Sequence, residues 1–258
     1  SHLMTNDLAT NVVSCHDRRV CGRLNMASDP ADVGRELGVE YERYAFSPRY
    51  NVPPGSALPI VLDSVGDTGE IVRRLETAGW GLVPGWAKDL KIGFRAFNAR
   101  SETVAEKPMF RSAFVRRRCV IPVNGYYEWA VEAGEKTPWL MHGDGWLFLA
   151  GLYEFAKCEA LDVPESDPRV ADGWYVSTTI LTMPSHGHLE SVHDRMPVVL
   201  DRSGIDRWCE PTETKADALG VLDSVLRDVD VDRVERYRVS KAVGNVRNDG
   251  PELMEAVE

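Results

Sequence analysis

The residue with the most distinctive chemistry in this sequence is Cys21, in the segment Val20-Cys21-Gly22-Arg23. An internal cysteine offers only a thiol. A cysteine with a free α-amine offers a thiol and an amine on adjacent carbons, which capture an aldehyde first as a Schiff base and then as a thiazolidine ring. An α-amine has a pKa near 8, so a useful fraction is neutral at physiological pH. Whether the Cys21 nitrogen is an amide or an amine therefore decides what this residue can do.

Two further segments carry candidate acid–base groups. Glu128 follows a strand-like run between a tyrosine and a tryptophan, and an apolar setting of this kind raises the pKa of a carboxyl group toward neutrality. The alternative is a glutamate that points to solvent from a strand end. His193 precedes an apolar run, and an imidazole titrates near physiological pH. Arg195 shares the face of His193 if a strand begins there.

Positive charge is concentrated around Asn98-Ala99-Arg100. Segment 88–118 holds nine basic and three acidic residues, a local net charge of +6 in a chain whose formal net charge is −10. The overall negative charge argues against a protein that coats nucleic acid by bulk electrostatics. A segregated basic segment instead favours a groove for a polyanion, and the alternative is a solvated basic face. Arg100 offers a planar fork for phosphate, although a structural Arg100–Glu102 network would explain the segment equally well.

Two tryptophans, Trp80 and Trp86, flank a stretch whose Gly and Pro residues exclude a regular helix. We expect at least one indole on a loop beside the basic segment, where it could stack on an unpaired base. The alternative is that both rings belong to the core.

The elements that must position these residues are mostly short strands bounded by Gly, Pro and Asp. We predict strands at 57–62, 119–123, 139–141, 146–152, 174–181 and 196–200. Helices are predicted over 31–37, 204–209, 212–226 and 67–78, and a surface loop over 158–173. This pattern predicts a single α+β domain, compact and rich in β-structure, with a curved or barrel-like antiparallel or mixed sheet, a few flanking helices and a cleft.

Composition narrows the class of protein. The chain has 258 residues, of which 43% are hydrophobic, enough for one large domain. The start shows no apolar run typical of a signal peptide and no later stretch is long enough to span a bilayer, so we expect a cytoplasmic protein with no membrane association. Five widely spaced cysteines predict neither disulfides nor zinc, and the His186–His188 pair lacks a third ligand, so we expect no metal and no cofactor.

Taken together, these segments resemble the SRAP family, the SOS-response-associated peptidase-like proteins that process abasic sites in single-stranded DNA. The resemblance runs in order along the chain and rests on six main blocks with a C-terminal continuation: Cys21-Gly22-Arg23, 50–55, 80–86, 98–102, 125–129 and 193–197, then Val239-Ser240 and 248–253. It implies that residues 21–258 form one SRAP-like domain with a positively charged cleft for single-stranded DNA.

The resemblance also implies roles for individual residues. Cys21 would be the nucleophile that forms a thiazolidine with the ring-opened abasic site, Asn98 would orient its amine, Glu128 would act as acid and base, and His193 would assist proton transfer. DNA contacts would come from the remaining residues of the pattern: Arg23, Arg100 and Arg195 on phosphates, Asn51 and Pro54 lining the site, and Trp80 or Trp86 stacking. The partner would be single-stranded DNA with an abasic site, bound by a monomer.

One departure bears on this chemistry. Family members begin Met-Cys, whereas here Val20 precedes Cys21 and residues 1–20 resemble an expression scar followed by an N-terminal extension. We expect this extension to be missing from the mature protein, either because Val20 is encoded by a start codon or because a propeptide is removed by self-cleavage through Cys21, Glu128 and His193. The leading hypothesis is covalent abasic-site capture, with lyase and autopeptidase activity as further expectations. The alternatives are a thiol peptidase and a noncovalent single-strand binder.

Overall fold

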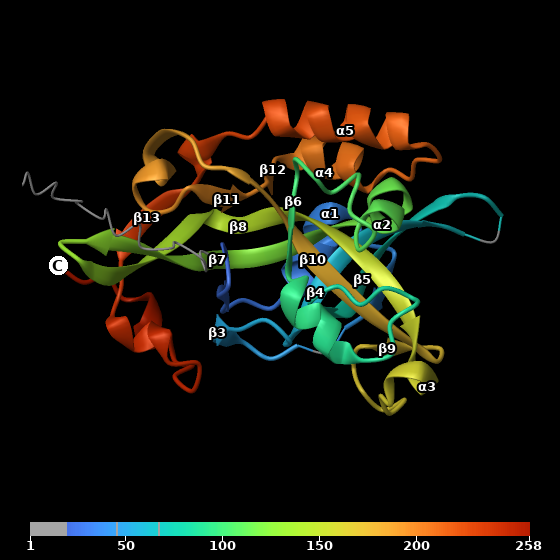
Figure 1. Ribbon diagram of the computed structural model, residues 1–258, viewed down its shortest axis with the longest axis horizontal. Coiled ribbons are helices and arrows are strands. Elements are labelled where there is room, and N and C mark those ends of the chain that lie inside the picture. Colours follow the sequence, from blue (N-terminus) through green and yellow to red (C-terminus); the bar gives the residue numbers. More distant parts are fainter. Residues whose placement is uncertain (1–19, 45, 67) are drawn as a thin grey trace, which may run out of the picture.

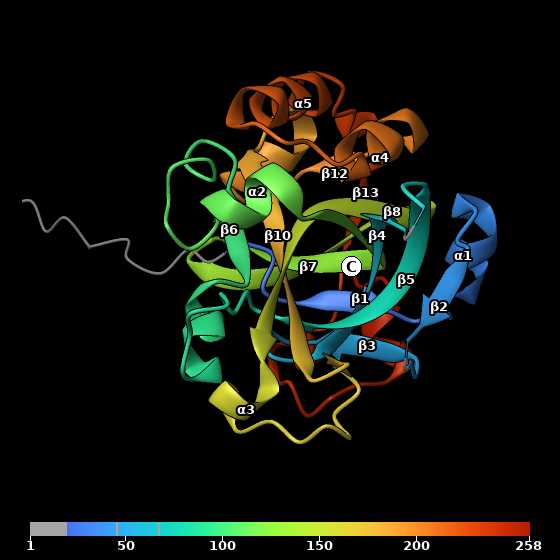
Figure 2. The same cartoon turned by 90° about the vertical axis from the view of Figure 1, so that its right-hand side faces the viewer.

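The computed structural model describes residues 20–258 except 45 and 67, so the expectations for residues 1–19 lie outside the described chain. Five strands close into a barrel in the order β8-β10-β5-β4-β7, with β7 pairing back onto β8 (Figures 1 and 2). Their bounds are β4 (Ala57–Val65), β5 (Ile71–Trp80), β7 (Arg118–Glu132), β8 (Glu135–Lys157) and β10 (Trp174–Pro184). All pairs in this ring are antiparallel except β5 with β10, which confirms the predicted mixed, barrel-like sheet.

The remaining strands extend the edges of this barrel. They are β1 (Leu24–Met26), β2 (Tyr41–Arg43), β3 (Arg49–Val52), β6 (Asn98–Arg100), β9 (Val170–Ala171), β11 (Arg195–Pro197), β12 (Val199–Leu200) and β13 (Glu235–Arg238). Strand β1 joins β7 to β3, while β6 and β11 both pair with the end of β10. The segments that carry Cys21, Asn98 and His193 are thereby brought to the same end of the barrel.

Two cores hold the fold together. Alternate strand residues point into the barrel, where Leu58, Ile60, Ile121, Val123, Leu149 and Ile180 are buried. A second core lies on the outside of the sheet, under α2 (Arg111–Arg116), α4 (Arg202–Cys209) and α5 (Lys215–Arg227), as Figure 2 shows. Its largest side chain, Trp208, donates its indole N–H to the carbonyls of Cys119 and Gly151 and so joins α4 to β7 and β8.

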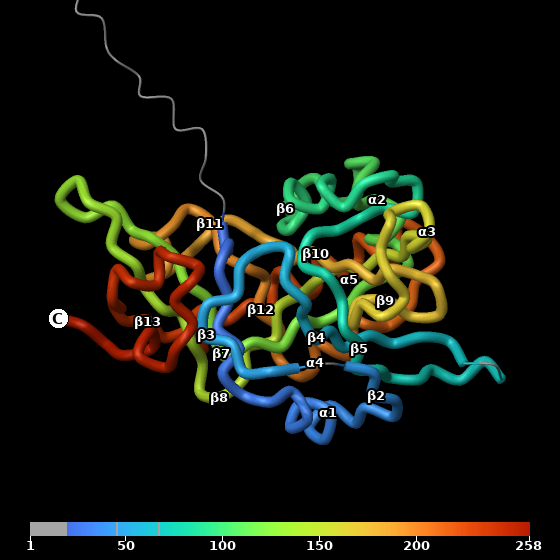
Figure 3. Tube along the Cα trace, turned by 90° about the horizontal axis from the view of Figure 1, so that it is seen from below, coloured from blue at the N-terminus to red at the C-terminus, as the bar shows by residue number. Residues whose placement is uncertain are grey.

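Tight turns set the register of the long hairpins. Ala133 and Gly134 between β7 and β8 both have positive φ, 50° and 84°, and Asp172 and Gly173 between β9 and β10 have 50° and 80°. Two-residue loops with positive φ at both positions match the twist of the flanking strands. Figure 3 shows a further hairpin, β4–β5, extending away from the body.

Most predicted elements are confirmed, including the helix at 31–37, which is α1 (Ala31–Leu37). Helix α4 starts after Asp201 and α5 after Thr214, and both side chains accept a backbone N–H as caps. The helix predicted over 67–78 is wrong, because residues 71–79 of β5 pair with β4. The predicted loop at 158–173 contains α3 (Cys158–Leu161) and β9.

The other helical turns are 3-10 segments: η1 (Leu90–Arg95), η2 (Gly187–Ser191), η3 (Val231–Arg233), η4 (Lys241–Gly244) and η5 (Pro251–Met254). Within the described residues, no helix is long and apolar enough to cross a membrane.

Candidate active site

Cys21 is fully buried at the entrance to the barrel, directly before β1. Its φ of 46° is in the left-handed region, which a residue with a Cβ occupies only at a cost of about 1 kcal/mol or more. Burial raises the pKa of the Cys21 thiol well above its usual range, and the nearby charge of Glu128 raises it further. The thiol is therefore protonated at neutral pH in the structure as it stands.

Glu128, on β7, is 3% exposed, and its carboxylate accepts the backbone N–H of Cys21. Burial raises the pKa of Glu128 to about 8, the charge of Asp194 acts in the same direction, and hydrogen bonds from the backbone N–H groups of Cys21 and Trp129 partly offset the rise. A carboxyl group with this pKa is largely protonated at pH 7 and can both donate and accept a proton near neutrality.

Asn98, on β6, contacts the other side of the same peptide group. Its side-chain NH₂ donates to the carbonyl of Val20. Its Oδ1 is buried and has no hydrogen-bond partner among residues 20–258 as described. The Val20–Cys21 peptide bond is therefore held between an amide donor on its carbonyl and a protonatable carboxylate on its nitrogen.

His193 follows η2, and the part of its side chain exposed to solvent is small. Its Nδ1 lies 3.0 Å from the backbone N–H of Arg195 and 3.0 Å from Oδ1 of Asp194. The N–H of Arg195 fits a neutral ring whose proton is on Nε2, whereas the carboxylate of Asp194 fits a ring protonated at Nδ1. Both tautomers of the His193 ring thus have a partner at Nδ1.

A basic pocket of about 530 Å³ opens beside this peptide group. It is lined by Val20, Arg95, Phe97, Asn98, Arg100, Lys107, Phe110, Thr182 and Arg195. Arg95 and Lys107 were not singled out individually by the sequence analysis, although both lie within the basic segment 88–118. The positively charged cleft that the sequence predicts corresponds to this pocket.

Arg195 is held rigidly at the pocket wall. Its guanidinium forms two hydrogen bonds to the Glu102 carboxylate, of 2.6 and 2.9 Å, and a third to the Thr182 carbonyl. These contacts with Arg195 lower the pKa of Glu102 to about 2. Glu102 therefore neutralises part of the charge that Arg195 presents, and the network expected at Arg100–Glu102 is formed by Arg195 instead.

Arg100 remains exposed on β6 at the rim of the pocket. We expect Arg100→Ala to weaken binding of single-stranded DNA about equally for all sequences and to reduce the salt slope of log K by about 1, because one phosphate contact is lost. Fluorescence anisotropy between 50 and 200 mM salt measures both quantities. Arg227→Ala, at an exposed arginine on α5, is the matched control and should change neither. An unchanged salt slope for Arg100→Ala would show that Arg100 touches no phosphate.

Arg23, Asn51 and Pro54 do not line this pocket. Arg23 donates to Oδ1 of Asn51 at 2.7 Å and to the Val243 carbonyl at 2.8 Å. The Asn51 side chain is buried, and its NH₂ donates to the carbonyls of Val243, Asn245 and Asn248. Arg23 and Asn51 therefore anchor the C-terminal segment against β3. The buried Asn51 amide already uses its donors and its acceptor in these contacts, so it is not placed to make the predicted direct contact with DNA.

The two tryptophans have different environments. Trp80 is 1% exposed, donates its indole N–H to the Phe97 carbonyl at 2.9 Å and packs edge-on against the Phe97 ring, so its predicted stacking on DNA is wrong. Trp86 is 63% exposed, as expected for a ring that meets a ligand. Phe94, on η1, is a second exposed aromatic ring that the sequence analysis missed.

Substitution should separate the roles of these tryptophans. Trp80→Ala is expected to destabilise the fold by about 3–5 kcal/mol, because it empties a large core site and removes a buried hydrogen bond. Trp86→Ala should leave stability within about 0.5 kcal/mol of the parent protein and weaken DNA binding. Urea denaturation and anisotropy measure the two effects. Equal stability loss in both variants would contradict the assignment of Trp86 to the surface.

The metal-ligating residue types are not clustered. Across the described part of the chain, His, Cys, Asp and Glu side chains form no group of three placed to hold a metal ion. The four described cysteines, Cys21, Cys119, Cys158 and Cys209, are free thiols.

Comparison with known proteins identifies the family of this chain. The model of the family described as "SOS response associated peptidase (SRAP)" matches residues 20–246. The abasic site processing protein YoqW of Bacillus subtilis is 34% identical over 242 residues, 92% of this chain and 100% of that protein. HMCES of Xenopus tropicalis, also named an abasic site processing protein, is 28% identical over 82% of this chain and 67% of its own length.

A crystal structure of a protein from Bacteroides thetaiotaomicron shares the fold, with a TM-score of 0.71 and 19% identity over 92% of this chain and 100% of that one. A family match that begins at Val20 and covers most of the described residues, together with relatives of this similarity, settles the assignment. The chain belongs to the SOS response associated peptidase family.

Proposed function

We propose that this protein captures abasic sites in single-stranded DNA covalently, through the α-amine and thiol of Cys21 once the residues before it are gone. The proposal rests on one observation: Glu128 and Asn98 both contact the peptide group that joins Val20 to Cys21. Glu128 accepts from the Cys21 nitrogen, and Asn98 lies on the Val20 side of the bond. A site built for a thiol nucleophile alone would place its acid–base groups on the sulfur.

The residues around Cys21 match the steps of this reaction. The ring-opened sugar presents an aldehyde, the Cys21 amine adds to it, and the resulting carbinolamine loses water when protonated Glu128 supplies the proton. The thiol then adds across the C=N bond and closes the thiazolidine ring with no further leaving group. The unpaired Oδ1 of Asn98 is available to accept a hydrogen bond from the amine, and the basic pocket supplies cations for the flanking phosphates.

The relatives named abasic site processing proteins support the substrate class. The test is to incubate a chain that begins at Cys21 with a single-stranded oligonucleotide carrying one abasic site and to look for a heat-stable adduct on a denaturing gel. The same oligonucleotide without the abasic site is the control. Failure to form an adduct, with binding intact, would leave the noncovalent single-strand binder as the function.

The hydrogen bonds of Glu128 and Asn98 to the Val20–Cys21 peptide group favour a second activity, self-cleavage before Cys21. The Cys21 thiol would attack the Val20 carbonyl carbon, Asn98 would stabilise the developing oxyanion, and Glu128 would protonate the departing nitrogen. The resulting thioester is then hydrolysed by water, which releases the upstream segment as a carboxylic acid and leaves Cys21 with a thiol and a free amine. The positive φ of Cys21 adds backbone strain at this bond.

Self-cleavage predicts that the full chain shortens on incubation to a product that begins at Cys21. We expect Asn98→Ala to slow this shortening by about 10²-fold or more, because one oxyanion donor is lost. Intact-mass spectrometry over time measures the rate, and Asn124→Ala, at an amide on β7 that pairs with Ser28, is the matched control. If the full chain stays intact for days and forms no adduct, self-cleavage is contradicted. Removal of the extension would then need another enzyme or a different translation start.

A further inference from the structure

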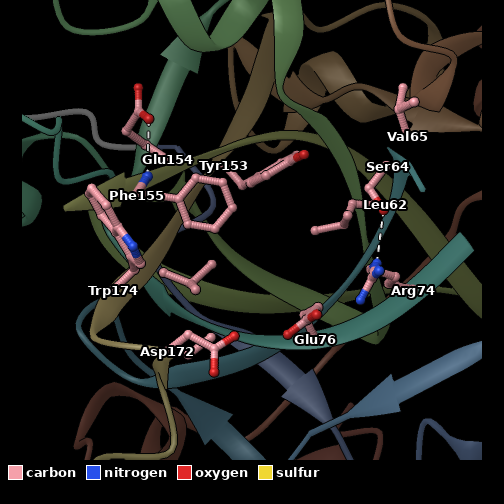
Figure 4. Close-up of a pocket in the computed structure, with 12 residues that line it drawn as sticks. Leu62, Ser64, Val65, Arg74, Glu76, Tyr153, Glu154, Phe155, Asp172 and Trp174 are labelled. Atoms are coloured by element: carbon pink, nitrogen blue, oxygen red, sulfur yellow. Dashed lines mark hydrogen bonds between the residues drawn. The ribbon is translucent and has the colours of Figure 1, made fainter. Parts of the chain in front are cut away.

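The opposite end of the barrel holds a second cavity, of about 630 Å³. It is lined by the ends of β4 and β8 and the beginnings of β5 and β10, and Figure 4 shows its side chains: Leu62, Ser64, Val65, Arg74, Glu76, Tyr153, Glu154, Phe155, Ala171, Asp172, Trp174 and Val176. None of these residues lines the basic pocket. Along β10, Val176 and Thr182 are six residues apart, about 20 Å at the usual rise per residue. The two cavities are therefore separate sites.

One wall of this cavity is aromatic. The rings of Tyr153 and Phe155 pack edge to face, with centroids 5.4 Å apart and an angle of 87°. Trp174 is 41% exposed, and the Lys157 ammonium lies 5.8 Å from the centroid of its ring. Such a wall offers flat, partly solvated surface on which a planar ring can stack.

Tyr153 lines the same space. The residue as a whole is only 6% exposed.

Two charged residues supply complementary hydrogen-bonding groups. Arg74 and Glu76 are two apart on β5, so they share a face about 6.6 Å apart. The Arg74 Nε–H donates to the Ser64 hydroxyl at 2.8 Å and its guanidinium lies over the Tyr41 ring, while its terminal NH₂ groups have no partner among the described residues.

Arg43 holds the side chain of Glu76 in place, as Ser64 does that of Arg74. Its Oε2 pairs with Arg43 at 2.6 Å, and its Oε1 has no partner within the described chain. Burial raises the pKa of Glu76, and Arg43 offsets part of the rise, as expected for a carboxylate in a partly desolvated cavity. A two-pronged donor and a single acceptor thus line the cavity side by side, across from the rings of Trp174 and Phe155 (Figure 4).

We infer that this cavity binds a guanine base, with the ring stacked on Trp174 and Phe155, O6 and N7 on Arg74, and the amino edge on Glu76. Guanine carries O6 and N7 as acceptors and N2–H as a donor, and arginine contacts with O6 and N7 are the commonest base-specific pairing. The cavity volume falls in the range typical of small-molecule sites. The base belongs either to a free nucleoside or to an unpaired nucleotide of a strand, and the inference does not depend on the proposed reaction at Cys21.

Calorimetric titration of the full chain tests this assignment with guanosine, inosine and adenosine as probes. We expect saturable binding that is strongest for guanosine, and a weakening of about tenfold or more in Trp174→Ala because a stacking surface is lost. Val131→Ala, at an exposed side chain on β7 outside this cavity, should bind guanosine as the parent protein does. Glu76→Ala should abolish the preference for guanosine over inosine, which lacks the amino group, because the variant removes the acceptor.

The source of the base follows from a second titration with a thymidine pentamer that carries one central guanine. A base recognised within a strand predicts that the pentamer loses affinity in Trp174→Ala, whereas a free nucleoside predicts that guanosine alone does. The inference is overturned if guanosine shows no saturable binding up to millimolar concentration, if its loss occurs in Val131→Ala rather than Trp174→Ala, or if free arginine or tryptophan binds more tightly than guanosine. Melting curves of each variant confirm that the exposed Trp174 can be removed without unfolding.

Discussion

A chain that begins at Cys21 is expected to convert abasic single-stranded DNA into a heat-stable adduct, and Cys21→Ala is expected to abolish that adduct completely. The loss is total because the substitution removes the thiol that closes the ring, while the remaining amine forms only a reversible Schiff base. Denaturing gels over a time course measure the yield. Cys158→Ala removes another buried thiol, which lies in a different core cluster from Cys21 and does not line the basic pocket, and is the matched control.

Cys21→Ser separates the two functional groups. The serine variant keeps the amine, so borohydride should trap its Schiff base, whereas no heat-stable adduct should survive without reduction. An adduct that persists unreduced in Cys21→Ala would move the chemistry to another residue.

Glu128→Gln is expected to slow adduct formation by about 10²-fold or more and to leave noncovalent DNA binding within about twofold of the parent protein. Glutamine preserves the shape and accepts the same backbone N–H, but it cannot supply a proton to the departing water. In the parent protein the rate should rise with pH as the Cys21 amine loses its proton and fall as Glu128 ionises near pH 8. In Glu128→Gln only the rising limb should remain, and an unchanged bell-shaped profile would remove Glu128 from the mechanism.

The same pKa has a consequence for stability. Glu128 has a pKa of about 8 in the folded protein and about 4.3 when unfolded, so the folded state binds more protons between these values and the free energy of unfolding falls as pH rises through this window. Glu128→Gln removes that dependence, so its melting temperature relative to the parent protein should increase between pH 5 and pH 9. Glu154→Gln is the control: it breaks an ion pair of 2.8 Å with Arg117 and should lose stability. A pH-independent difference for Glu128→Gln would contradict the raised pKa.

Much of the fold is readable from the sequence because its strands carry local signals. The runs around Ile121 and Leu149 are apolar, β-branched or aromatic, and bounded by Gly and Pro, and both are strands of the barrel. The error at residues 67–78 has a physical cause. Strand β5 reaches the barrel mouth, where Arg74 and Glu76 interrupt the apolar pattern, and its pairing with β4 overrides the local signal.

The sequence indicates which residue types belong to the candidate site, but it does not show how these residues are arranged around Cys21. Cys21 and Glu128 are 107 residues apart, and Asn98 and Val20 are 78 apart, so nothing local in the sequence shows that these groups share one peptide bond. The same holds for Arg195, whose pairing with Glu102 spans 93 residues. Trp80 and Trp86 are close in sequence, but only the packing of Phe97 against Trp80 decides which ring is buried.

The most direct test of covalent capture at Cys21 is the intact mass of the adduct followed by peptide mapping. The account predicts a species equal to the protein plus the abasic oligonucleotide less one water, with the modification on the peptide that begins at Cys21. An adduct mapped to a lysine, or a product that retains residues before Cys21, would contradict it.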